Sequence, residues 1–185
     1  AEEGQENILG RLAAMDSSRQ EINGGDSCTV LAYLLGKSAS KPPTWTVLLL
    51  NCGLHDIRTD PEAGARQVEP EIYAENLTKL LPLAARLSRW VVWLRTTPVV
   101  DARHQRLNPE FQRFNADVER YNQIADALMD QFGIPKIDLY RFTYRLSSSF
   151  ESLDALYSDH VHFIEPVRQL QAAYLAGWLE AHPFA

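Results

Sequence analysis

Long apolar runs, an excess of basic residues and clustered cysteines are all missing from this sequence. No apolar run approaches the roughly 18–20 residues that a membrane-spanning helix needs, and the longest, around residues 46–50, has the length of a strand. The formal net charge of −6 argues against a general nucleic-acid binder, which would carry a basic face. We therefore expect neither a membrane span nor a nucleic-acid partner.

The two cysteines, Cys28 and Cys52, are too few for a disulfide framework and lack the clustered Cys/His spacing of a zinc site. Internal repeats, low-complexity tracts and interdomain linkers are missing as well. The 185 residues, 45% of them hydrophobic, suit one globular domain with a core of its own. We expect a single domain over residues 1–185, and the composition indicates no cellular compartment.

What the sequence does contain is an alternation of strands and helices. Strands apolar on both faces, as central parallel strands are, are predicted at residues 45–51, 90–96 and 134–139, with an edge strand at 19–22. Helices are predicted at residues 8–15, 71–86, 109–132 and 166–181, and one begins from an N-cap at Asp26 or Ser27. The helix that begins at Asp26 or Ser27 has a predicted buried stripe of Val30, Leu31, Leu34 and Leu35. The alternation implies right-handed crossovers and an α/β fold, a three-layer α/β/α sandwich with a parallel sheet.

The unusual polar residues fall where the predicted strands end. Ligands of such sheets bind beyond the carboxyl ends of the strands. The segments expected there are residues 25–27, 53–56, 96–98 and the loop that holds Asp159 and His162. Their convergence at one end of the sheet predicts an active site.

The pair Asp159 and His162 precedes the last predicted helix. A carboxylate three residues before a histidine on a loop can turn back and accept a hydrogen bond from the imidazole Nδ1–H. That bond would leave Nε2 as a general base. His160 could serve as the base instead, although its side chain should point to the opposite side.

Two glycine turns supply candidate anion-binding groups. Gly25 lies at a predicted helix N-terminus, where backbone N–H groups and the helix dipole favour negative charge. Gly53 and His55 follow the central strand, and a ring or backbone N–H there could face a developing oxyanion. Each turn taken alone is better explained as an ordinary capped turn.

Together these segments resemble the SGNH (GDSL-like) hydrolase family. Asn-Gly-Gly-Asp-Ser at residues 23–27 looks like its second block, which places an oxyanion-hole N–H at Gly25. Gly-Leu-His-Asp at residues 53–56 looks like its third block, with His55 where the family has asparagine. Asp-His-Val-His at residues 159–162 matches its fifth block. The resemblance implies a flavodoxin-like fold and a serine esterase with Asp159 and His162 in its triad. It further implies small acyl esters or acylated carbohydrates as substrates, and no metal or organic cofactor.

The family's first block, an apolar strand that ends in the nucleophilic serine, has no clear counterpart. Ser27 would be the nucleophile if Gly25-Asp26-Ser27 were that block, but residues 19–23 are too polar for a strand buried on both faces. We therefore expect an N-terminally incomplete domain, in which residues before Ala1 or another segment supply the strand.

Two other functions stay open at this stage. A catalytically silent domain of the same fold would bind a carbohydrate or a protein partner. A nucleotide-binding flavodoxin-like domain is the third reading, but no Gly-x-Gly-x-x-Gly follows a strand, and Asp159 and His162 would have no task.

Overall fold

A parallel three-stranded sheet lies at the centre of the computed structural model, which describes residues 25–39 and 45–182. The strands are β1 (Trp45–Leu50), β2 (Ser88–Leu94) and β3 (Lys136–Ile137), in the order β1-β2-β3. Val47 pairs with Trp90 and Leu50 with Trp93, and Leu94 of β2 pairs with Ile137 of β3. The parallel sheet confirms the predicted α/β fold class.

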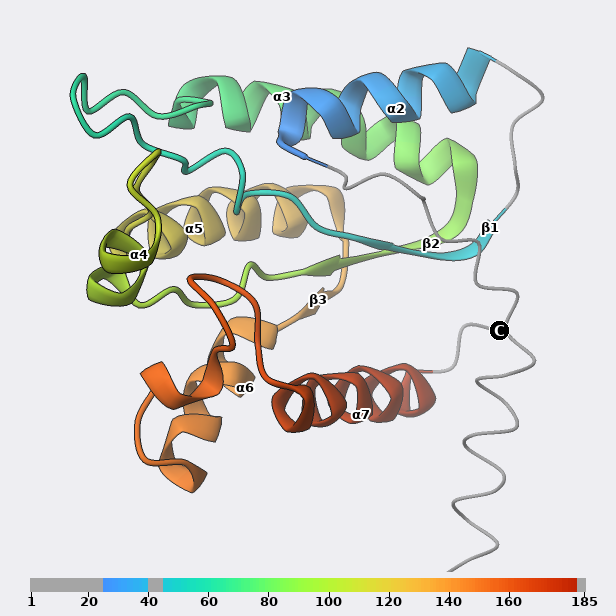
Figure 1. Cartoon of the computed structure of the whole chain (residues 1–185). Helices are drawn as coiled ribbons and strands as arrows, with labels where there is room; N and C mark the ends of the chain where they lie inside the picture. Colours follow the sequence, from blue (N-terminus) through green and yellow to red (C-terminus); the bar gives the residue numbers. More distant parts are fainter. Residues whose placement is uncertain (1–24, 40–44, 183–185) are drawn as a thin grey trace, which may run out of the picture.

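Helices cover both faces of this sheet (Figure 1). The helices α2 (Ser27–Ala39), α3 (Pro70–Leu87) and α5 (Asn115–Phe132) lie on one side. On the other side lie α6 (Leu139–Leu146) and α7 (Glu165–Ala181), while the short helix α4 (Asp101–Leu107) sits beyond the end of β2. None of the described helices is long and apolar enough to cross a membrane.

The core forms where β2 and α3 meet. Val91, Val92 and Trp93 are all buried, as expected of a strand covered on both faces. Helix α3 contributes a buried stripe at helical spacing. Its members are Tyr73, Leu77, Leu80, Leu81 and Ala84. This packing fixes the carboxyl end of β2, and with it the loop that leads to α4.

Helix α2 agrees with its prediction except at one residue. It begins after Asp26, whose Oδ1 accepts hydrogen bonds from the backbone N–H and the hydroxyl of Thr29, both at 2.9 Å. Asp26 is therefore the N-cap. Val30 and Leu34 are buried as predicted and Leu31 is partly buried against the core, but Leu35 is 51% exposed.

The second half of the chain departs from prediction in two places. The helix predicted from residue 109 begins at Asn115, because Asn108 Oδ1 accepts the backbone N–H groups of Glu110 and Phe111 and Gln112 then pairs with Thr59. The strand predicted at 134–139 is only two residues long, because α6 begins at Leu139 with Asp138 as its N-cap. Helix α4 was not predicted.

Three predictions involve residues outside the described part of the chain: the helix at 8–15, the strand at 19–22, and a nucleophile strand supplied by a segment beyond it. Within the described residues, β1 pairs with β2 alone, and its Leu49 is 39% exposed. A further strand beside β1 therefore remains a prediction.

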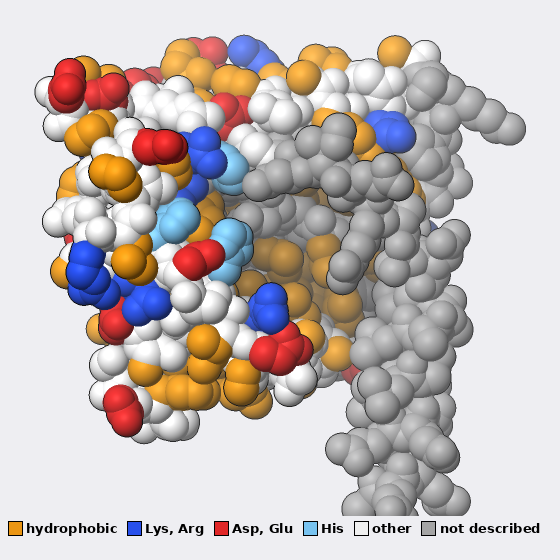
Figure 2. All heavy atoms as spheres, viewed as in Figure 1, with side chains coloured by type: hydrophobic (Ala, Val, Ile, Leu, Met, Phe, Trp, Pro, Cys, Tyr) orange, Lys and Arg blue, Asp and Glu red, His pale blue; other side chains and the backbone are white. Residues whose placement is uncertain are grey.

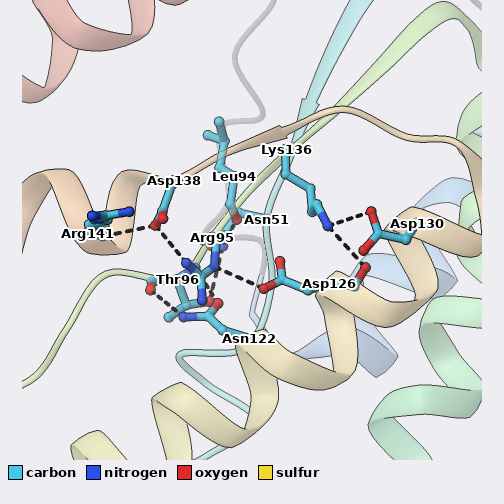
Figure 3. Close-up of polar contacts among 10 residues, drawn as sticks. All are labelled: Asn51, Leu94, Arg95, Thr96, Asn122, Asp126, Asp130, Lys136, Asp138 and Arg141. Atoms are coloured by element: carbon cyan, nitrogen blue, oxygen red, sulfur yellow. Dashed lines mark hydrogen bonds and ion pairs between the residues drawn. The ribbon is translucent and has the colours of Figure 1, made fainter.

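Side-chain hydrogen bonds join the ends of β1 and β2 to each other and to α5 (Figure 3). The side chain of Asn122 in α5 forms two hydrogen bonds with the backbone of Thr96. Its Oδ1 accepts the Thr96 N–H and its Nδ2 donates to the Thr96 carbonyl oxygen, each at 2.9 Å. Asn51 donates to the carbonyl oxygen of Leu94 at 2.8 Å. These bonds satisfy backbone groups that the sheet leaves unpaired, so they position the loop beyond β2.

Arg95 ties the same region to α5 and α6 (Figure 3). Its guanidinium lies 3.3 Å from Asp126 of α5 and 2.8 Å from Asp138, the N-cap of α6. The arginine thereby links β2, α5 and α6 at the end of the sheet where functional residues were predicted.

Candidate active site

Asp159 and His162 form a local hydrogen-bonded unit. The Nδ1 atom of His162 lies 2.7 Å from Oδ2 of Asp159. The other carboxylate oxygen accepts the backbone N–H of Val161 at 2.8 Å and that of His162 at 2.7 Å. Burial raises the pKa of Asp159, but these three hydrogen bonds together hold it well below its usual range. The residue is therefore a carboxylate that fixes the imidazole tautomer with Nδ1 protonated.

The opposite edge of the imidazole faces solvent. The His162 side chain is 74% exposed, and no hydrogen bond to its Nε2 atom occurs within the described residues. An imidazole held at Nδ1 by a carboxylate and open at Nε2 has the arrangement of a general base. The geometry pairs Asp159 with His162 rather than with His160.

Arg103 of α4 anchors the loop that carries this pair. Its guanidinium donates to the carbonyl oxygen of Asp159 at 2.5 Å and to that of Tyr157 at 3.0 Å, and it forms an ion pair with Asp154 at 2.8 Å. The Tyr157 hydroxyl donates to the carbonyl oxygen of Pro98, beyond β2. Sequence reasoning missed Arg103, because nothing local distinguishes it from a surface arginine of α4.

Ser27 is fully buried at the start of α2. Its backbone N–H donates to both carboxylate oxygens of Asp56, at 2.9 and 3.1 Å. Its Oγ accepts a hydrogen bond from Asn76 of α3 at 2.9 Å. Ser27 therefore joins the two predicted glycine turns and α3.

The turn after β1 places His55 beside the N-terminus of α2. Asp56 binds Ser27, and the carboxylate of Asp26 acts on the titration of His55, so Gly25 and His55 belong to neighbouring turns. Gly53 permits this turn: its φ is +137°, and a side chain there would meet Thr96 at 2.8 Å. The sequence-predicted pair of oxyanion donors thus comes from two turns that the structure brings together.

His55 is neutral at ordinary pH. Burial lowers its pKa to about 4, with contributions from the nearby charges of Arg58 and Arg113. A neutral imidazole still carries one N–H, so His55 can donate a hydrogen bond without carrying a full charge.

Further histidines and arginines lie beside the Asp159–His162 unit. The ring of His160 is 6.5 Å from that of His162 and packs edge-on at 4.9 Å against buried His104. The charges of Arg58 and Arg113 act on the titration of His160 as they do on that of His55. Histidine side chains gather along one wall of a hollow with hydrophobic atoms at its base (Figure 2). No group of three or more metal-ligating side chains occurs within residues 25–39 and 45–182.

No protein-family model matches the chain, and no curated protein matches it in sequence. Solved structures match it in fold. The acetylxylan esterase Axe2 from Geobacillus stearothermophilus superposes with a TM-score of 0.68 at 15% identity, over 97% of this chain and 81% of that one. A lipase/acylhydrolase from Enterococcus faecalis gives 0.64 at 17% identity, over 96% and 84%. A member of the lipolytic G-D-S-L family from Veillonella parvula gives 0.65 at 17% identity, over 86% and 78%.

Proposed function

We propose that this chain, which has the fold of the G-D-S-L acylhydrolases and acetylxylan esterases, is a serine ester hydrolase for small acyl esters, including acylated carbohydrates. The observation that carries the proposal is the Asp159–His162 pair, with its 2.7 Å hydrogen bond and its exposed Nε2 edge. The esterases of this fold support the reaction class.

In the proposed mechanism, a serine hydroxyl attacks the acyl carbonyl while Nε2 of His162 takes its proton. The imidazolium that forms is stabilised by the Asp159 carboxylate and then returns the proton to the leaving alcohol. A water molecule, deprotonated by His162, then attacks the acyl-enzyme carbonyl, which releases the carboxylic acid and regenerates the serine. The backbone N–H of Gly25 and the ring N–H of His55 would stabilise the tetrahedral oxyanion, each by about 3 kcal/mol.

The proposal gives Ser27 a structural role. A hydroxyl that is fully buried and already accepts a hydrogen bond from Asn76 is poorly placed to reach a carbonyl carbon. We assign the nucleophile to a serine outside residues 25–39 and 45–182.

Replacing His162 with alanine tests the function directly. In the full-length protein, His162→Ala should lower p-nitrophenyl acetate turnover by at least about 1,000-fold, because the serine loses its base. The matched control is His182→Ala, which removes another exposed histidine at the end of α7 and should leave turnover unchanged. Unchanged turnover in His162→Ala would reject the assignment.

A fluorophosphonate probe identifies the nucleophile. It should label a single serine, and peptide mapping should place the label away from Ser27. Labelling at Ser27 would overturn the structural role given to that residue. A full-length protein that neither reacts with the probe nor hydrolyses esters would be the silent binding domain instead.

A further inference from the structure

Two arginines share one aromatic ring beside the candidate active site. Arg58 follows the His55 turn, and Arg113 precedes α5. The guanidinium carbon of Arg58 lies 4.5 Å from the centre of the Phe111 ring, and that of Arg113 lies 4.9 Å from it. Arg113 is only 2% exposed. Two cations are therefore held close together, one of them buried.

Neither of these arginines forms an ion pair with a carboxylate among the described residues, although others in the chain do. Arg66, Arg95 and Arg103 each lie within 3.3 Å of an aspartate oxygen. Arg113 donates instead to the carbonyl oxygen of Leu54 at 2.6 Å and contacts Nε2 of His104 at 3.2 Å. A buried cation without a counter-ion is costly, and a bound anion would offset that cost.

The groups recorded around the two guanidiniums are mostly histidines. Their neighbours are His55, His104 and His160, whose pKa values are lowered by burial and then by these arginines. The carboxylates of Asp26 and Asp159 act on the same histidines in the opposite direction, but neither forms an ion pair with Arg58 or Arg113 among the described residues. Burial and the charge of Arg58 together lower the pKa of Arg113 to about 10.

The nearby histidines add one unpaired donor. A guanidinium can only donate, so Nε2 of His104 accepts from Arg113 and the proton of this ring lies on Nδ1. Within residues 25–39 and 45–182, that buried Nδ1 has no hydrogen-bond partner, and neither has the buried Nε of Arg58. The cluster therefore offers donors and positive charge beside the imidazole proposed as the base. Figure 2 shows Lys or Arg atoms next to the histidines along the wall of the hollow.

We propose that Arg58 and Arg113 form a subsite for a carboxylate carried by the ester substrate. A guanidinium suits this role because its planar N–H groups match the two oxygens of a carboxylate. Arg58 would bind the anion directly, and Arg113 would supply buried charge behind it. The substrate class that follows is an ester with a nearby carboxylate. The carboxylate belongs either to the alcohol, as in an acylated acidic sugar, or to the acyl group, as in a half-ester of a dicarboxylic acid. This inference rests on the proposed function.

Matched charged and neutral esters test the subsite in the full-length protein. 4-Acetoxybenzoate and its methyl ester place the carboxylate on the alcohol side, while mono-p-nitrophenyl succinate and its methyl ester place it on the acyl side. In Arg58→Gln, the ratio of kcat/KM for the charged ester to that for the neutral one should fall about tenfold in one of the two pairs. Arg58→Lys should recover part of the loss. The pair that responds identifies the side that carries the carboxylate.

The matched control is Arg89→Gln, which removes an exposed arginine at the second position of β2, away from the carboxyl ends of the strands. This variant should leave both ratios unchanged. If Arg58→Gln lowers kcat/KM equally for charged and neutral esters, the residue has a structural role and the subsite is overturned. Unchanged kcat/KM for all four esters would overturn it as well.

A binding measurement keeps this inference separate from the esterase proposal. Sodium succinate, compared with sodium chloride at equal ionic strength, should raise the Tm of the unmodified protein and raise it less in Arg58→Gln. Such a difference in a protein without ester turnover would reject the hydrolase and retain the anion subsite. Equal effects in both proteins would reject the subsite.

Discussion

Asp56 shows how one buried carboxylate can position two turns. Its side chain is fully buried, and burial raises its pKa, while the hydrogen bonds from Ser27 oppose that rise. The same hydrogen bonds tie the turn after β1 to the start of α2. Asp56 therefore supports both proposed oxyanion donors without facing the substrate.

Removing the Asp56 carboxylate should destabilise the protein. Asp56→Ala leaves the buried N–H of Ser27 without an acceptor, which should lower the free energy of unfolding by about 2 kcal/mol. Urea denaturation followed by circular dichroism measures this change. The control Asp130→Ala removes an exposed carboxylate that pairs with Lys136 and should cost less than about 1 kcal/mol. Equal losses in the two variants would contradict this account of Asp56.

The elements are delimited by local backbone chemistry as well as by packing. Helix α5 ends at Gly133, which adopts the left-handed conformation with φ 66° and ψ 28° and donates its N–H to the last turn. Helix α6 interrupts the predicted third strand because Asp138 accepts the backbone N–H of Arg141 at 2.9 Å. Short capping interactions thus decide where the chain changes direction around the sheet.

Two glycine-to-alanine substitutions should have opposite effects. Gly133→Ala should destabilise the protein by about 1 kcal/mol, because alanine disfavours a positive φ even though nothing obstructs a Cβ there. Gly177→Ala, inside α7 with equally open space around the new Cβ, should stabilise it by up to about 1 kcal/mol. Shifts of the denaturation midpoint in the same direction would contradict this reasoning.

At the scale of the whole molecule, buried histidines make stability depend on pH. His104 is fully buried, and burial together with Arg113, His160 and Arg58 lowers its pKa to about 4. The unfolded chain, with a histidine pKa of about 6.5, binds the proton more readily than the folded one. The stability contribution of neutral His104 is therefore complete above about pH 6.5 and is lost as the pH falls toward 4.

We expect the free energy of unfolding to fall between pH 7 and pH 5, with about 1–2 kcal/mol of the loss due to His104. His104→Gln, which keeps an acceptor for Arg113, should show a loss smaller by that amount. Guanidinium denaturation of both proteins at the two pH values makes the comparison. Identical pH dependence would show that His104 does not titrate in this range.

Much of the fold was predictable because its signals are local. The β2 residues Val91 to Trp93 are consecutive and apolar, and the spacing of apolar residues in α3 follows the helical period. The weak points were short elements. Leu139 fits the end of a strand or the start of a helix equally well, and α4 is too short for its seven residues to show a period.

For the candidate site, the sequence alone determined the Asp159–His162 unit, because a carboxylate and an imidazole three residues apart can close a hydrogen bond within a single loop. Only the tertiary structure decided the rest. Arg103 holds that loop from α4, Asp56 reaches Ser27 across 29 positions, and Arg113 meets Arg58 around the Phe111 ring. Such contacts join residues from separate elements, and their partners become known only when the sheet and its helices set the distances between them.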